Sequence, residues 1–436
     1  MTEIIIPNNW QPRDYQFDLW EYMVNGGTRA VGVWNRRSGK DSVAVNLTTV
    51  KSLRRVGLYW HLLPSQRQSR KVIWDGIDSQ GRRLIDQAFP PEIRKSINNT
   101  EMKIELKNGS IWQCVGSDNY DSLVGANPVG VVFSEYSVAD PKAWDYIRPI
   151  LAENGGWAVF IYTPRGRNHG YRLFANAKKA GWFTQLLTVE ETHAISLEAI
   201  EEERKSGMDD DMIQQEFFCS FEAGAAGSYY GKLIEQARAQ GRIGHVPYDP
   251  ALSVITSWDL GIGDSTVIWF WQVSGSEVRA IDYYESSGVG LDHYIKLLNS
   301  KPYIYSQHIG PHDIEVREMG TGKSRKEIAR ELGVTFTVAP NLPIDDGINA
   351  VRQLLPRLWI DDDKCERGID ALLSYHREYD DRLHDYKASP LHDWSSHSAD
   401  AARMFAVSNR LLRSEDYRAP DRYSKTHKPD RNWRTA

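Results

Sequence analysis

The sequence contains little cysteine, the residue that cross-links many small secreted domains. Only three cysteines occur among 436 residues, and Cys114, Cys219 and Cys365 lie far apart along the chain. This spacing fits neither a disulfide framework nor a zinc site built from neighbouring thiolates. We therefore expect a protein of the reducing cytoplasm and not a secreted one.

Long apolar runs are missing as well. Runs such as Val131–Phe133 are far shorter than the roughly 20 residues that a membrane-spanning helix needs. The first ten residues carry neither the basic segment nor the long apolar segment of a secretory signal. We therefore expect no membrane association and no export.

The chain also lacks an excess of positive charge. Lys and Arg total 53 against 58 for Asp and Glu, a net charge of −5. This balance excludes a protein that is basic over its whole surface, although a local basic surface for nucleic acid stays possible. Hydrophobic residues make up 41% of the chain, enough at this length to form the cores of two or three domains.

Strands and helices are predicted to alternate through the first half. A helix-like stretch at 42–53 follows the first of four apolar runs that predict strands, at 30–34, 57–63, 129–133 and 157–163. Asn108-Gly109 predicts a hairpin between 103–106 and 110–115. This order predicts an α/β domain with a parallel sheet and helices on both faces.

A run of small residues at 223–228 separates the two halves and predicts a hinge. Three strands, expected at 254–259, 266–273 and 278–284, then predict an antiparallel meander that α/β units follow. The predicted first domain covers 1–222, with a helical lid at about 190–222, and a linker follows at 223–250. The predicted second domain covers 251–411, and a mobile basic tail follows at 412–436.

The segment between the first strand and the first helix has features of a phosphate-binding loop. Backbone N–H groups and a helix N-terminus bind phosphates in such loops. Gly39 would let the backbone approach closely, and Lys40 would reach the β and γ phosphates. Trp34 stands where the first glycine is expected, and Asp41 where a hydroxyl usually binds Mg²⁺. Taken alone, this segment is equally well interpreted as an ordinary turn.

The strand at 129–133 leads to a carboxylate, Glu135, that could orient an attacking water. Ser134 occupies the preceding position, where an Asp usually binds the metal. In such folds the side chains at the positions of Asp41 and Ser134 contact the same ion. In this chain the carboxylate and the hydroxyl have swapped positions, so one of each still lies beside the ion. We predict a compensated Mg²⁺ site at these two residues.

Other residues are candidates for the nucleotide site, each with an ordinary alternative. Arg36 and Arg37 would stabilise charge on the γ-phosphate, or would be solvated loop charges. Thr163 would sense hydrolysis, or would belong to a turn. Gln16 would pair with the edge of adenine. Arg148 would act on the nucleotide of a neighbouring subunit, or would form a surface ion pair. The predicted nucleotide-binding residues are Gln16, Arg36, Arg37, Ser38, Gly39, Lys40, Asp41, Ser42 and Thr163.

Three carboxylates in the second half predict a metal site. Asp259 and Asp313 end two predicted strands, and Asp400 lies on a predicted helix. Two divalent ions about 4 Å apart would activate water against a phosphodiester. His397 shares the helical face of Asp400, and extra ligands are possible at Asp264 and Asp393. Each Asp at a strand end is also a common turn former.

Together these segments resemble the large terminase subunit of tailed bacteriophages, the motor and nuclease that packages viral DNA. The most specific match is Ser396-His397-Ser398-Ala399-Asp400-Ala401, which is similar to the family's third nuclease acid. Residues 36–40, 131–135 and 163–166 resemble its Arg-containing Walker A, its Walker B with catalytic Glu, and its coupling motif. The resemblance extends from about Gln16 to Arg410.

The resemblance implies an N-terminal P-loop ATPase domain of the ASCE type and a C-terminal RNase H-like nuclease domain with a mixed sheet. It implies ATP and Mg²⁺ as cofactors, with Mn²⁺ also possible at the nuclease site. The implied catalytic residues are Lys40, Arg37 and Glu135 in the ATPase, and Asp259, Asp313 and Asp400 in the nuclease.

The implied partners are double-stranded viral DNA, a portal protein and a small terminase subunit. A homo-oligomeric ring, of five subunits, would dock on the portal of a procapsid in the host cytoplasm. Lys323, Arg325 and Lys326 would grip a DNA strand, or would form a solvated helix face.

Two other functions stay open. A repair helicase–nuclease would unwind strands, whereas a packaging motor moves intact duplex. A non-hydrolysing scaffold would keep a decayed nucleotide pocket; Asp41 and Ser134 favour this interpretation, while Lys40 and Glu135 oppose it.

Overall fold

The computed structural model describes residues 10–78, 80–118, 123, 125–222, 227–261, 265–317, 322–380 and 385–415. The chain divides into two compact units, residues 1–239 with 366–396, and residues 240–365 with 397–436. The segment 366–396 thus belongs to the first unit, although the sequence placed it in the second domain. The predicted bounds 1–222, 223–250 and 251–411 stay predictions. Most of the predicted tail, from residue 416 on, lies outside the described residues, as do 223–226 of the predicted hinge.

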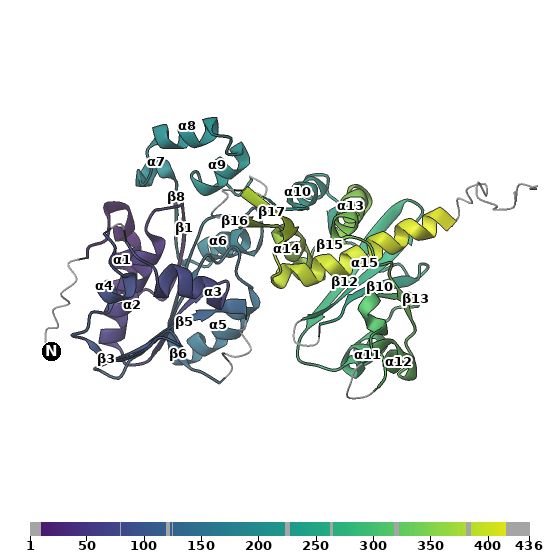
Figure 1. The fold of residues 1–436 in the computed structure, drawn as a ribbon, viewed down its shortest axis with the longest axis horizontal. Coiled ribbons are helices and arrows are strands. Elements are labelled where there is room, and N and C mark those ends of the chain that lie inside the picture. Colours follow the sequence, from purple (N-terminus) through teal and green to yellow (C-terminus); the bar gives the residue numbers. More distant parts are fainter. Residues whose placement is uncertain are drawn as a thin grey trace, which may run out of the picture. The chain divides into compact units, whose positions relative to one another are not determined.

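An eight-stranded sheet organises the first unit (Figure 1), in the order β3-β4-β5-β2-β6-β7-β1-β8. Its strands are β1 (Arg29–Trp34), β2 (Leu58–Leu63), β3 (Arg94–Asn98), β4 (Lys103–Leu106), β5 (Ile111–Gly116), β6 (Pro128–Ser134), β7 (Trp157–Tyr162) and β8 (Phe183–Leu187). The strands from β5 to β8 in this order run parallel, and β3 and β4 add an antiparallel edge. The predicted parallel sheet and the predicted hairpin are confirmed.

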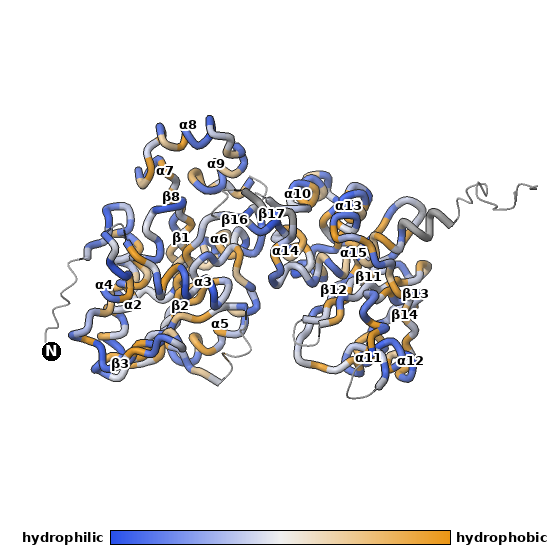
Figure 2. The backbone as a smooth tube through the Cα atoms, in the orientation of Figure 1, coloured by the Kyte–Doolittle hydropathy of each residue, from blue (hydrophilic) through white to orange (hydrophobic). Residues whose placement is uncertain are grey.

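Both faces of this sheet carry an apolar core. Alternate side chains of a strand point to opposite sides, so each strand contributes to both cores. On β1, Ala30 and Trp34 pack into one apolar core, and Val31 and Val33 pack into another. Figure 2 shows the hydrophobic stretches that run through the sheet. The helical segments of this unit are η1 (Asp14–Gln16), α1 (Phe17–Val24), α2 (Lys40–Arg54), α3 (Gln66–Gln68), η2 (Ser69–Trp74), α4 (Leu84–Ala88), α5 (Lys142–Asn154), α6 (His169–Lys179), α7 (Val189–Thr192), α8 (Leu197–Lys205), α9 (Asp210–Glu216), α10 (Gly231–Ala239) and α14 (Glu366–Ser374).

A seven-stranded sheet organises the second unit, in the order β14-β13-β10-β11-β12-β15-β9. Its strands are β9 (Ile243–Gly244), β10 (Val254–Asp259), β11 (Thr266–Ser274), β12 (Glu277–Ser286), β13 (Tyr305–Gly310), β14 (Phe336–Val338) and β15 (Leu358–Asp361). The strands β10, β11 and β12 form the predicted antiparallel meander. The others pair in parallel, so the sheet is mixed, as predicted.

The helical segments of the second unit are α11 (Leu291–Ser300), η4 (His312–Glu315), α12 (Arg325–Glu331), α13 (Ile344–Leu354), η5 (Leu355–Arg357) and most of α15 (Trp394–Glu415). Trp271 of β11 stacks on Phe405 of α15 with ring centroids 4.5 Å apart, and this contact fixes α15 on the sheet. The first unit also contains a two-stranded sheet of β16 (Arg377–Asp380) and β17 (Asp385–Pro390). Among the described residues no helix is both long and apolar enough to cross a membrane.

Candidate nucleotide and nuclease sites

The loop between β1 and α2 has the backbone of a phosphate-binding turn. Gly39 lies in the left-handed region with φ 76°, directly before the first residue of α2. A Cβ at this position would also lie 3.0 Å from Gln16 Nε2. The left-handed backbone angle favours glycine, and a side chain here would also require the Gln16 amide to shift.

Lys40 points into this loop and is buried. Its ammonium donates hydrogen bonds to Thr163 Oγ1 at 3.0 Å, to Asn35 O at 3.2 Å and to Trp34 O at 3.3 Å. Thr163 directly follows β7, the strand next to β1 in the sheet. The structure thus brings together Lys40 and the predicted sensor hydroxyl, which lie 123 residues apart in sequence.

Asp41 and Ser134, the two exchanged positions, are in direct contact. Ser134 Oγ donates to Asp41 Oδ1 at 2.6 Å, and His61 Nε2 lies 3.3 Å from the same oxygen. Burial alone would raise the pKa of Asp41, but the hydrogen bonds from His61 and Ser134 and the charge of Lys40 lower it below its ordinary value. Asp41 is therefore held as a carboxylate. One carboxylate and one hydroxyl side by side are oxygen ligands that suit Mg²⁺.

Glu135 follows β6 with a left-handed backbone, φ 52°, which is unusual for a residue with a side chain. Its N–H donates to Ile161 O of β7 at 2.8 Å, and this bond fixes the turn. Burial raises the pKa of the Glu135 carboxyl against the opposing charges of Lys40 and Arg165. A strained backbone and a raised pKa are frequent among catalytic groups.

Gln16 packs against the same loop. Its Nε2 donates to Ser38 O at 2.8 Å and its Oε1 accepts from Arg13 N at 3.1 Å, so the amide stabilises the loop itself. Pairing of Gln16 with adenine stays a prediction. Arg36 and Arg37 are exposed in the loop, and Arg148 is exposed on α5.

Glu216, at the end of α9, is a residue of this site that the sequence analysis missed. Its buried carboxylate pairs with Arg165, and its backbone carbonyl accepts from Arg36 N–H at 2.8 Å. Burial would raise the pKa of Glu216, but Arg165 and Arg36 lower it below the usual range. The sequence offered no signal for Glu216, because it is one of many acidic residues in a charged helical stretch.

Asp259 and Asp400 lie on the expected strand and helix, whereas Asp313 lies in a short helix and not at a strand end as predicted. Asp259 ends β10, Asp313 lies in η4 after β13, and Asp400 lies on α15. The strands β10 and β13 pair in parallel with Ser257 opposite Ile309, so Asp259 and Asp313 follow the same edge of the sheet. The Nδ1 atom of His397 lies 2.9 Å from Asp259 Oδ2, one helical turn before Asp400.

No group of three or more His, Cys, Asp or Glu side chains is arranged to hold a metal ion within the described ranges. Asp400 Oδ1 pairs with Arg403 at 3.0 Å. Asp264 lies outside the described residues. Asp393 instead accepts from Ser395 N at 2.9 Å at the start of α15. The metal-binding triad therefore stays a prediction.

The candidate DNA-contacting lysines Lys323 and Lys326 each form an ion pair. Lys323 pairs with Glu331 at 2.6 Å, and Lys326 pairs with Glu315 at 2.7 Å. Arg325 donates to the Leu260 carbonyl at 3.0 Å. Their contact with DNA stays a prediction.

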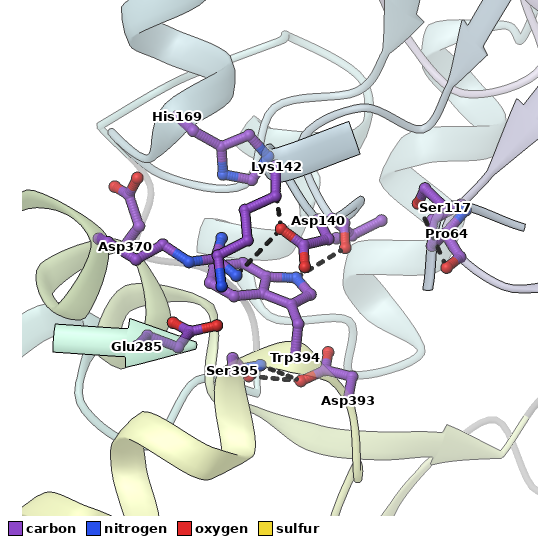
Figure 3. Close-up of polar contacts among 12 residues, drawn as sticks. Pro64, Ser117, Asp140, Lys142, His169, Glu285, Asp370, Asp393, Trp394 and Ser395 are labelled. Carbon is purple, nitrogen blue, oxygen red and sulfur yellow. Dashed lines mark hydrogen bonds and ion pairs between the residues drawn. The ribbon is translucent and has the colours of Figure 1, made fainter. Parts of the chain in front are cut away.

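The segment 366–396 packs against the loop that follows Glu135 (Figure 3). Trp394 Nε1 donates to Val138 O at 3.3 Å, and Asp140 pairs with Arg367 at 3.0 Å. The Arg367 guanidinium also lies over the Trp394 ring, 4.1 Å from its centroid. Nearby in the same unit, Arg172 pairs with the buried Asp370.

No family model matches the chain. The large subunit of the terminase of Escherichia phage T5 is 24% identical over 394 residues, which cover 85% of this chain and 84% of that relative. The predicted resemblance to large terminase subunits is confirmed. The large terminase of a thermophilic bacteriophage in complex with ADP is 14% identical, with TM-score 0.41 over 92% of this chain and 100% of that one. The nuclease domain of the P22 large terminase is 18% identical, with TM-score 0.31 over 41% of this chain and 94% of that one. The Mn-bound nuclease domain of the large terminase of bacteriophage SPP1 has TM-score 0.31 and 16% identity, over 39% of this chain and 95% of that one.

Proposed function

We propose that this protein is a viral DNA-packaging motor. ATP hydrolysis in the first unit drives double-stranded DNA into a procapsid, and an endonuclease in the second unit cuts concatemeric DNA. The observation that carries this proposal is the meeting of Lys40, Asp41, Ser134 and Thr163 around one edge of a parallel sheet. The similarity to the phage T5 terminase subunit along most of both chains supports it.

In the ATPase site, the loop N–H groups and Lys40 bind the phosphates. Asp41 and Ser134 would hold Mg²⁺, which would supply positive charge to offset that of the phosphates. Glu135 orients the attacking water and accepts its proton. Arg36 and Arg37, exposed at the loop, stabilise negative charge on the transferred group.

Hydrolysis is coupled to motion through contacts that begin at Thr163. When the γ-phosphate leaves, Lys40 is released from it and bonds Thr163. This hydrogen bond reports the state of the nucleotide. Arg165, two residues after Thr163, pairs with Glu216 at the end of α9. This pair transmits the change to the lid helices α7, α8 and α9.

In the nuclease, Asp259, Asp313 and Asp400 would hold Mg²⁺ or Mn²⁺, and the ion would activate water against a DNA phosphodiester. His397 orients Asp259 through its hydrogen bond. Lys323, Arg325 and Lys326 lie near Asp313 in sequence and contact the DNA backbone. The strength of such phosphate contacts falls as salt rises.

The remaining parts of the proposal concern assembly. A ring of five subunits docks on a portal protein, transiently on the procapsid in the host cytoplasm, and a small terminase subunit selects the DNA site.

The deciding experiment measures ATP turnover and strand displacement with duplex DNA and portal present. We expect DNA-stimulated turnover without displaced strands. Displaced strands would instead indicate a repair helicase–nuclease, and absent turnover would indicate a scaffold that binds ATP without hydrolysis.

A further inference from the structure

His61 is a fully buried histidine in the middle of an apolar strand. It lies on β2, where it is opposite Cys114 of β5 and Val132 of β6 in the parallel register. Its side chain has an exposed fraction of 0%, and the neighbouring Trp112 ring lies edge-on, with centroids 6.4 Å apart. Burial of an imidazole costs free energy unless its nitrogens find partners, so a histidine here requires a reason.

The partner of His61 is the carboxylate of Asp41. The Nε2 atom lies 3.3 Å from Asp41 Oδ1. A hydrogen must sit on Nε2, because a bare nitrogen would place its lone pair against that of the carboxylate oxygen. His61 therefore donates a hydrogen bond to the first residue after the phosphate-binding lysine.

The geometry at Asp41 shows what this bond achieves. Ser134 Oγ donates to the same oxygen, Oδ1, at 2.6 Å. Two donors on Oδ1 fix the rotation of the carboxylate and leave Oδ2 as the oxygen that can face a cation. The donors also withdraw negative charge from a residue that must lie near phosphates, where like charges repel.

We propose that His61 is the positioning residue for the ATPase metal, a role that rests on the proposed function of Asp41 as a metal ligand. His61 does not contact the cation; it holds Asp41 in the orientation that binds it. A position 41 occupied by serine or threonine would present a neutral hydroxyl and would need no such donor. Partners of this kind typically change metal affinity 10- to 100-fold when they are removed.

The test uses the full-length chain and the affinity for a fluorescent ADP, measured with and without Mn²⁺. The ratio of the two affinities reports metal binding at the nucleotide and does not depend on turnover. In His61→Leu, we expect this ratio to fall roughly tenfold or more, with metal-free affinity unchanged. In His61→Gln, whose amide nitrogen takes the place of Nε2, we expect most of the ratio to return.

Tyr59→Phe is the matched control. Tyr59 is two residues away on the same strand and is buried, and its hydroxyl bonds the Arg55 carbonyl at 2.6 Å without contacting Asp41. It should therefore leave the ratio unchanged. A His61→Leu ratio equal to that of the wild type would overturn the proposal, and so would a glutamine variant that behaves like leucine.

Asp41→Asn distinguishes a wrong role for His61 from a wrong metal site. If it loses the metal dependence while His61→Leu keeps it, Asp41 is a ligand and only the role of His61 is wrong. If Asp41→Asn keeps the full metal dependence, the proposed metal site itself is wrong, and the role of His61 is lost with it.

Discussion

Ser134 Oγ donates a hydrogen bond of 2.6 Å to Asp41 Oδ1, across 93 residues of sequence. At both of these positions the chain departs from the usual nucleotide-binding motifs, in residues that would face the metal. A hydroxyl that gives its hydrogen to a carboxylate keeps its lone pairs for a cation. The usual motifs place a hydroxyl at position 41 and a carboxylate at position 134. With the two swapped, the same two ligand groups still lie side by side.

The first prediction follows from this pair. Asp41→Ser leaves two hydroxyls and Ser134→Asp brings two carboxylates together, so each single variant should lose about 100-fold in ATP turnover. The double variant restores one of each and should recover to within about tenfold of the wild type. Steady-state turnover of the three variants tests this. A double variant no more active than either single one would contradict compensation.

The second prediction concerns Glu135. Glu135→Gln removes the proton acceptor and should reduce ATP turnover roughly 10²- to 10⁴-fold, while ADP affinity and DNA cutting persist. Because burial raises the pKa of Glu135, wild-type turnover should fall on acidification at a higher pH than an ordinary glutamate would give. A pH–rate profile under saturating ATP measures this. Loss of cutting in Glu135→Gln would contradict the division into two sites.

The third prediction concerns the ion pair between the buried Glu216 and the partly exposed Arg165. Glu216→Gln removes the negative charge of this pair and should lower the free energy of unfolding by about 2 kcal/mol at neutral pH. Because the folded-state pKa of Glu216 lies below its ordinary value, this stabilisation is present at neutral pH and is lost as the pH falls through that pKa. The difference between wild type and variant should therefore shrink in acid.

Urea unfolding at a series of pH values measures this difference, and Glu222→Gln is its control. Glu222 also pairs with an arginine, Arg167, but its side chain is 69% exposed. That variant should change the free energy of unfolding by less than about 1 kcal/mol. Equal losses in both variants would show that burial of Glu216 adds nothing.

The fourth prediction concerns Asp313. Asp313→Ala should reduce metal-dependent DNA cutting about 100-fold or more and leave ATP turnover intact, because Asp313 lies in the second unit. Asp363→Ala removes another exposed carboxylate of the same unit and should cut normally. Gel assays of plasmid cleavage with Mg²⁺ and Mn²⁺ measure both. Normal cutting by Asp313→Ala would exclude it from the nuclease site.

The strands of the first unit and the loop between β1 and α2 could be predicted from the sequence because their signals are local. Alternating apolar runs and the turn residues between them indicate strands, and Gly39-Lys40 between a strand and a helix indicates a phosphate site. Glu216 and His61 could not be assigned in this way, because their roles depend on partners far along the chain. His61 did leave one signal, an imidazole inside the apolar strand β2.

The segment 366–396 was also assigned by order along the chain to the second domain, whereas its partners, such as Val138 and Asp140, belong to the first unit. Sequence order predicts neighbouring elements well, but it does not indicate where a later segment returns to an earlier one.

Because residues 366–396 pack with the first unit, the protein is difficult to divide into fragments that fold separately. The backbone passes from one unit to the other at 239/240, 365/366 and 396/397. No single scission therefore yields two whole pieces: a fragment that stops at Ala239 leaves the surface around Val138 uncovered, and its complement carries Trp394 without the carbonyl it bonds. Both fragments must therefore be present together for the hydrogen bond between Trp394 and Val138 to form.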